Sequence, residues 1–167
     1  ALVGMPYTLK FLWSPFIDRF KLPILDRRRG WMAITQIVLA GLLFFMSLLN
    51  PSEQTILLAT VAFLISFSSA TQDIVIDAYR REALTDEELG LGSSLYVNGY
   101  RVAIILSGAM ALAMAESMPW SRVYQIMALM MGSGVVFTFL APSTEDQAAE
   151  HAPKSMKKAP WLIIFSV

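Results

Sequence analysis

The fold is decided by the stretch TILLATVAFLISFSSATQDIVIDA, residues 55–78, in which a long apolar run ends in two acidic residues. The run from Thr55 to Ala70 carries no charge, and a helix needs about 20 mostly apolar residues to cross a bilayer. Asp73 and Asp77 are four residues apart, so they lie on one face of the predicted helix. Because ionisable groups are costly inside lipid, this pair is a candidate functional feature.

The composition indicates a membrane protein. The 167 residues are 56% hydrophobic and 16% charged, and the mean hydropathy is positive, which is too apolar for an ordinary soluble domain. The formal net charge is zero, so no basic field indicates nucleic acid as a partner. With one His and no Cys, the sequence offers neither a histidine metal cluster nor a thiol nucleophile. No nucleophile, base and orienting group form a recognisable set, so we expect neither an enzyme nor a cofactor.

Five segments meet or nearly meet the length of a spanning helix. Both ends of the sequence lie in apolar runs, so we expect an internal fragment of a longer, all-α, polytopic membrane helix bundle. A sixth span is expected to begin near Pro160. The five segments are residues 1–17, 31–49, 55–78, 93–115 and 123–141.

The orientation follows from the basic residues between the segments. The connections 18–30, 79–92 and 142–159 contain five, two and three of the 13 Lys and Arg. Short loops rich in Lys and Arg face the cytoplasm, so we expect these three connections to be cytoplasmic. The connection after residue 141 mixes acids, alanines and lysines, which favours a boundary between two groups of helices.

Polar side chains follow helical spacing in three of the five segments. Residues 31–49 and 123–141 carry no charge, whereas the other three segments each carry a polar stripe. We therefore expect those three helices to face a shared interior and the two uncharged ones to face lipid. The stripes are Tyr7, Lys10 and Ser14; Ser66, Ser69, Asp73 and Asp77; and Ser94, Asn98 and Arg101.

Two cations are expected near the bilayer midplane. At ~1.5 Å of rise per residue, Lys10 and Arg101 each lie about 12 Å from the cytoplasmic ends of their segments. Together they would bind an anion, or they would neutralise Asp73 to hold the bundle together. Asp73 is either a proton-coupling carboxylate or a fixed ion-pair partner. Asp77 lies near the cytoplasmic boundary, which favours a gate or a loop-docking residue, and Tyr100 could stack on a sugar or anchor its helix.

Four blocks of sequence resemble the muropeptide permeases of the AmpG family, within the major facilitator superfamily. The resemblance runs from residue 1 to about Pro142. The blocks are KFLWSP (10–15), RRGW (28–31), SATQDIVIDA (69–78) and GYR (99–101).

The first connection is also similar to the loop between the second and third helices of facilitators, whose pattern is Gly-x-x-x-Asp-Arg-x-Gly-Arg-Arg. Ser14 stands where that pattern has Gly, and the loop is longer between Arg19 and Arg27. Its usual docking against the other half of a transporter therefore does not follow. The residues that match the pattern are Asp18, Arg19, Arg28 and Arg29.

The resemblance implies that residues 1–141 are helices 2–6 of the N-terminal six-helix half of a facilitator. Residues 142–159 would then be the central cytoplasmic loop, and residues 160–167 the start of helix 7. It also implies a permease of the bacterial inner membrane, which imports GlcNAc-anhydroMurNAc peptides with protons for cell-wall recycling. Its partners would be lipid, substrate, protons and the remaining helices.

The resemblance further implies roles for individual residues. Carboxylates of the substrate would suit the two cations, and the two Asp residues would couple or gate proton movement. The implied substrate-binding residues are Lys10, Gln72, Asn98, Tyr100 and Arg101, and the implied coupling or gating residues are Asp73 and Asp77.

Two other functions remain open. The fold could carry another organic anion, such as an acetyl-CoA-like ester or a sugar phosphate, because acetyl-CoA transporters share the Gln-Asp character of the 55–78 helix. The chain could also belong to a membrane scaffold subunit whose buried charges are only structural.

Overall fold

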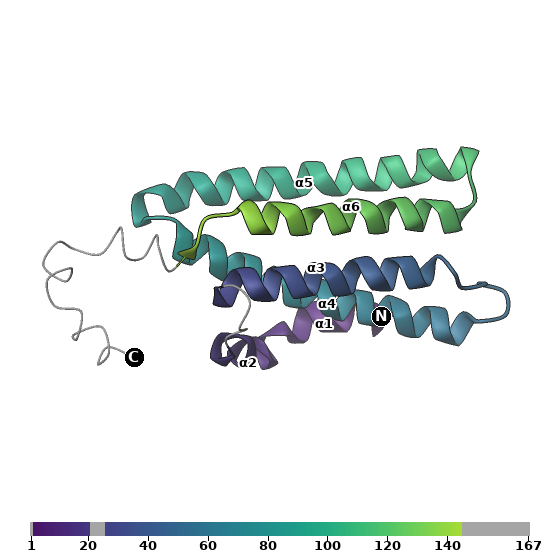
Figure 1. The fold of residues 1–167 in the computed structure, drawn as a ribbon, viewed down its shortest axis with the longest axis horizontal. Coiled ribbons are helices and arrows are strands. Elements are labelled where there is room, and N and C mark those ends of the chain that lie inside the picture. The colour runs from purple at the N-terminus through teal and green to yellow at the C-terminus, as the bar shows by residue number, and fades with distance from the viewer. Residues whose placement is uncertain (1, 21–25, 145–167) are drawn as a thin grey trace, which may run out of the picture.

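The computed structural model describes residues 2–20 and 26–144, and in these ranges the chain is helical without strands (Figure 1). Within these ranges, four helices are long and apolar enough to cross a membrane. An all-α bundle of membrane-length helices is therefore confirmed. The four helices are α3 (Arg27–Met46), α4 (Thr55–Ala83), α5 (Asp86–Ser117) and α6 (Trp120–Leu140).

The N-terminal segment is broken, where the sequence analysis expected one helix over residues 1–17. Pro6 and Pro15 each stand in the first turn of one of its pieces. A Pro inside a continuous helix removes a hydrogen bond and clashes with the carbonyl four residues earlier, so the helix restarts around each one. The pieces are η1 (Leu2–Gly4), α1 (Met5–Leu9), η2 (Lys10–Leu12) and α2 (Ser14–Arg19).

The connection expected over residues 79–92 is mostly helix. Helix α4 continues to Ala83, where two arginines in its last turn suit the negative end of the helix dipole. Helix α5 begins at Asp86, and Thr85 and Glu88 form a capping box, with 2.8 Å between Thr85 Oγ1 and Glu88 Oε2. Only a tight turn separates the two helices. The hydropathy pattern detects the lipid-spanning part, but these helices continue past it.

Helix α3 is central in the described bundle, packing along α4 on one side and α6 on the other. The buried residues of these helices include Leu39, Val75 and Val123. Between α3 and α6, Thr138 Oγ1 donates a hydrogen bond to Gln36 Oε1 at 2.8 Å. Gly134 lies opposite, since a Cβ there would be 3.3 Å from Gln36 Nε2. One polar pair thus joins the apolar parts of α3 and α6, while apolar side chains occupy their outer faces.

Helix α5 is the least packed of the four. None of its 32 residues is buried, and it has few contacts with α4 and α6. Figure 1 shows it at the edge of the bundle, with α6 beside it. Near the start of α5, Gly92 lies against Leu84 in the turn that follows α4, and an added Cβ would overlap the end of the Leu84 side chain. That flexible side chain would have to move to accommodate a larger residue at position 92.

Candidate functional site

A polar cluster lies where the broken N-terminal segment crosses α4. The hydroxyl groups of Tyr7, on α1, and Ser69, on α4, are hydrogen-bonded at 2.7 Å. One turn further along α4 stands Asp73, which is half-buried. Lys10, on η2, is the cation whose charge acts on the Asp73 carboxylate. No ion pair joins Lys10 to an acidic side chain in residues 2–20 and 26–144.

The position of Lys10 depends on the break in its segment. Residues 10–12 form a short 3-10 turn between α1 and α2, and such turns inside a helix often mark hinges. The turn is anchored on α4 by Trp13, whose Nε1 donates to Thr71 Oγ1 at 3.1 Å. Lys10 is therefore held close to Asp73 but is not bound to it.

A second cluster connects α4 to α5. Asp77 Oδ1 accepts a hydrogen bond from Arg80 Nη2 at 3.2 Å. The guanidinium carbon of Arg80 lies 4.4 Å from the ring centroid of Tyr96, a cation–π distance. The rings of Tyr96 and Tyr100 are nearly parallel, at 16°, with 6.4 Å between their centroids. Asp77 is thus connected to Tyr100 through two intermediate side chains.

The two clusters form one polar region. The Tyr7 hydroxyl lies within electrostatic range of both Asp73 and Tyr100. Tyr96 is within range of Asp73 and Asp77. Four elements, α1, η2, α4 and α5, therefore contribute polar side chains to one region along α4.

Asn98 and Arg101 lie elsewhere on α5. At 3.6 residues per turn, positions 94, 98 and 101 fall on the side of the helix opposite Tyr96 and Tyr100. Asn98 Nδ2 donates to the carbonyl oxygen of Ser94 at 2.9 Å, and Arg101 is exposed. Within the described ranges, neither side chain contacts Lys10 or Asp73. The polar stripe identified in the sequence is therefore not the face of α5 that lies next to α4.

Tyr96 and Arg80 belong to this region but were not among the expected site residues. Arg80 follows Asp77 at a spacing that lets the two side chains meet, and Tyr96, like Tyr100, could stack on a sugar or anchor its helix. The indication available was the spacing of Tyr96 and Tyr100, four residues apart on one helical face. Which face of α5 lies next to α4 is a tertiary feature, seen in the contact of the Arg80 cation with the Tyr96 ring.

Gln72 has an unusual environment for a polar side chain. Its Oε1 atom is buried and accepts no hydrogen bond from any described residue. Buried acceptors are nearly always paired, so an unpaired one next to Asp73 is a candidate contact for a ligand.

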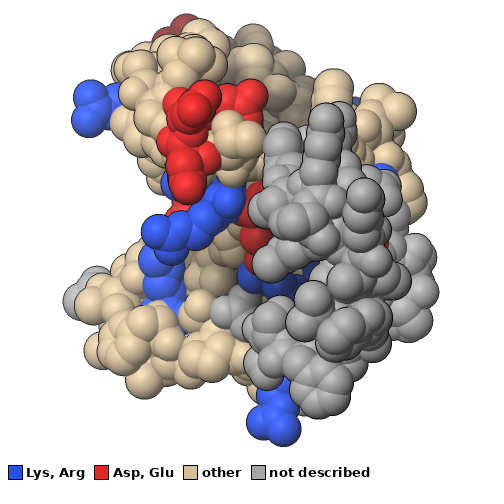
Figure 2. Space-filling view, turned by 90° about the vertical axis from the view of Figure 1, so that its left-hand side faces the viewer, with Lys and Arg blue, Asp and Glu red and all other residues tan. Residues whose placement is uncertain are grey.

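The arginines of the first connection bind the ends of other helices. Arg28, with only 6% of its side chain exposed, donates from Nε and Nη2 to Glu82 Oε1 at 2.9 and 2.6 Å. Arg27 Nη2 reaches the same oxygen at 3.2 Å. Cations at the N-terminus of a helix oppose its dipole, and Glu82 offsets this cost. Figure 2 shows Lys and Arg side chains in a band at this end of the molecule, next to Asp and Glu.

Arg29 fixes the end of α6. Its Nη2 and Nε atoms donate to the carbonyl oxygens of Phe139 and Thr138, at 2.7 and 3.2 Å. The Tyr79 hydroxyl donates to the carbonyl oxygen of Pro142 at 2.9 Å. These bonds satisfy carbonyl groups at the end of a helix and fix the direction in which the chain leaves it.

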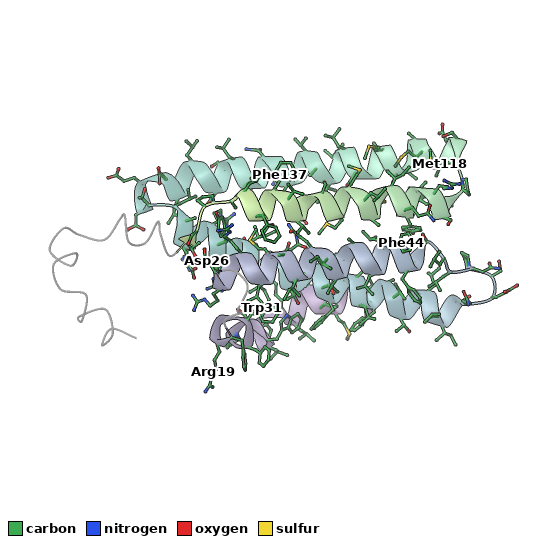
Figure 3. All side chains as sticks on the ribbon, viewed as in Figure 1. Arg19, Asp26, Trp31, Phe44, Met118 and Phe137 are labelled. Carbon is green, nitrogen blue, oxygen red and sulfur yellow. The ribbon has the colours of Figure 1, made fainter. Side chains whose placement is uncertain are left out.

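The remaining loop residues are less constrained. Arg19 is exposed and points away from the bundle (Figure 3). The side chain of Asp18, residues 145–159 of the expected central loop and the expected start of a seventh helix lie outside the described residues.

The sequence comparisons identify the fold family. Residues 3–167 match the sequence model of the family described as Major Facilitator Superfamily. The chain belongs to this superfamily. It is thus part of a transporter family rather than a known class of enzymes, and its four membrane-length helices make this facilitator a multi-pass protein of the bacterial inner membrane.

Individual relatives narrow the resemblance. The facilitator chain is 40% identical over 160 residues to the anhydromuropeptide permease of Escherichia coli K12, covering 95% of this chain and 32% of that protein. It is 49% identical over 140 residues to an uncharacterized protein of Haemophilus influenzae, covering 83% and 33%. It is 32% identical over 135 residues to putative transporter AmpG 1 of Rickettsia bellii, covering 78% and 33%. The expected AmpG-type resemblance is confirmed, and the chain spans about a third of the length of these relatives.

Two polar hollows open at the charged end of the facilitator. One, of about 350 Å³, lies between α2 and the ends of α3 and α4, and the other, of about 290 Å³, lies between α4 and α5. Asp77 and Arg81 line both. Asp77 therefore lies at the border of both hollows.

Proposed function

We propose that the full-length facilitator is a proton-coupled permease that imports anhydro-muropeptides across the inner membrane. The observation that carries this proposal is the 40% identity to a protein named anhydromuropeptide permease, because the match covers 95% of this chain. The cluster around Lys10, Asp73 and Tyr100 supplies chemistry that suits such a substrate. A muropeptide carries carboxylates, which an ammonium group binds, and sugar rings, which aromatic side chains bind.

Lys10 is proposed to bind a substrate carboxylate, with Gln72 as a hydrogen-bonding neighbour. Lys10 forms no ion pair in the described residues, and Gln72 Oε1 is an unpaired acceptor. Asn98 and Arg101 face away from α4. The binding site proposed around Lys10 and Tyr100 therefore does not include them.

Asp73 is proposed to carry the proton. When Asp73 is ionised, its charge competes with the substrate carboxylate for Lys10. When Asp73 is protonated, Lys10 is free to bind the substrate. Proton and anionic substrate therefore favour each other's binding, and this coupling is reciprocal, as a symporter requires. Asp77, held by Arg80 at the border of both hollows, is proposed to act as a gate.

A transport competition assay tests the choice of substrate. Vesicles containing the full-length facilitator would take up labelled anhydro-muropeptide under a proton gradient, in the presence of excess unlabelled compounds. We expect unlabelled muropeptide to abolish labelled uptake, and acetyl-CoA and a sugar phosphate to leave it unchanged. Equal inhibition by acetyl-CoA would contradict the choice of muropeptide as the substrate and would favour another organic anion.

A further inference from the structure

The ring of Tyr100 is held in place although its helix is hardly packed. Helix α5 buries none of its residues, so its own packing does not fix the orientation of its side chains. A described contact between Arg80 and Tyr96 attaches its first half to α4, and Leu84, in the turn between the two helices, lies against Gly92. Tyr96 in turn lies nearly parallel to Tyr100.

We propose that Tyr100 is a stacking platform for a pyranose ring of the substrate and that Arg80 and Tyr96 are the residues that position it. The proposal rests on the proposed function insofar as the substrate contains sugar. The Tyr100 side chain is 50% exposed and Tyr96 stacks along one side of it, so part of the ring remains open. Pyranose rings have an apolar face of C–H groups that packs on such a ring. Tyrosine also offers a large contact area while losing little conformational freedom.

Arg80 suits the positioning role because of its planar cation. A guanidinium group stays charged at all relevant pH values and stacks on aromatic faces. One of its nitrogen atoms is bonded to Asp77 at 3.2 Å, while its carbon lies 4.4 Å from the Tyr96 centroid. Arg80 does not contact the proposed sugar position itself; it acts through Tyr96. A series of side-chain contacts thus connects the proposed gate to the proposed sugar subsite, running through Asp77, Arg80, Tyr96 and Tyr100.

Equilibrium binding to the purified full-length facilitator tests this subsite. The probes are the GlcNAc-anhydroMurNAc disaccharide without peptide, and the stem peptide without sugar. For Tyr100→Leu and Arg80→Gln, we expect Kd for the disaccharide to rise about tenfold, the scale of one aromatic or cation–π contact. Tyr100→Phe retains the ring, so its Kd should stay within about threefold of wild type. Arg80→Lys keeps the charge but loses the planar group that stacks on Tyr96, so its Kd should lie between those of wild type and Arg80→Gln. Kd for the stem peptide should not change in any variant.

Tyr124→Leu is the matched control, because Tyr124 pairs with Trp120 on α6, with 6.1 Å between ring centroids, away from the cluster. An unchanged disaccharide Kd in Tyr100→Leu would overturn the platform, and an unchanged value in Arg80→Gln would overturn the positioning role. Equal losses in Tyr100→Phe and Tyr100→Leu would also overturn stacking. If the facilitator takes up muropeptide but Tyr100→Leu does not change sugar binding, the platform is refuted and the transport function is retained. Tyr100-dependent sugar binding without muropeptide uptake would retain the platform and refute the transport function.

Discussion

Arg28 and Lys10 illustrate how the surroundings of a charged residue decide its role. Arg28 is buried and bonded to Glu82 at 2.6 Å, so its charge is used in holding α3 to α4. Lys10 is only half-buried and forms no ion pair in the described ranges. We therefore assign the first cation to structure and the second to substrate.

Replacing Lys10 tests this division. Lys10→Gln removes the charge, and a hydrogen bond to a charged group is worth about 1.5–3 kcal/mol, so KM for the anionic substrate should rise roughly 10- to 100-fold. The amount of protein in the membrane should match wild type, and Lys10→Arg should recover part of the affinity. Uptake kinetics and quantitative blotting provide the two measurements. A parallel fall in abundance and activity would instead make Lys10 a structural charge, as in the scaffold alternative.

Replacing Arg28 should have the opposite signature. Arg28→Leu leaves Glu82 without its main partner, and breaking a buried pair costs about 3–5 kcal/mol. Because 33% of the Glu82 side chain is exposed, we expect a smaller loss, about 2 kcal/mol, seen as a lower unfolding temperature in detergent. The exposed Arg19 is the control, and Arg19→Leu should leave the unfolding temperature unchanged. If the double variant Arg28→Leu/Glu82→Leu is no more stable than Arg28→Leu alone, the loss does not come from the unpaired Glu82.

At the scale of whole helices, the sequence predicts which segments form helices better than it predicts which face each helix turns toward its neighbours. The apolar run of α4 and the polar breaks around α6 are local properties, so hydropathy finds these helices. The restart of the first segment at Pro15 is also local and readable from backbone chemistry. The face that α5 turns toward α4 is not local, because it is seen only in the contact of Tyr96 with Arg80 on the neighbouring helix. Polar spacing along a single helix therefore indicated Arg101, and the position of Tyr96 follows only from the fold.

The α3–α6 contact offers a test at this scale. A Cβ at Gly134 would already crowd Gln36 Nε2, so Gly134→Leu should overpack the contact and destabilise the bundle by roughly 1–3 kcal/mol. Gly41 on α3 is the control, because a Cβ there meets nothing within 4 Å, and Gly41→Leu should be tolerated. Thermal unfolding of the purified protein compares the two. Equal unfolding temperatures for both variants would mean that α3 and α6 do not approach each other as described.

The relatives that this chain matches are longer than the chain itself. The chain spans about a third of its named relatives, and α5 buries no residue within it. Secondary transporters move substrate by rocking two repeats around a site near the midplane. This chain would supply only one side of such a site, and its substrate cannot be read from the fold family alone, because one fold hosts many functions.

We therefore expect residues 1–167 alone to be inactive in transport. Vesicles containing only this chain should show no gradient-dependent uptake of labelled muropeptide, while vesicles with the full-length facilitator at matched abundance should accumulate it. Uptake by the chain alone would contradict the two-sided site.

The most direct test of the account is proton-driven uptake of labelled anhydro-muropeptide by the full-length facilitator, comparing wild type with Asp73→Asn at matched abundance. Wild type should accumulate substrate under a proton gradient. Asp73→Asn mimics the protonated side chain, so it should lose accumulation but retain exchange of labelled for unlabelled substrate. If Asp73→Asn accumulates substrate as wild type does, Asp73 does not carry the proton. If wild type accumulates none, the facilitator is not a muropeptide symporter.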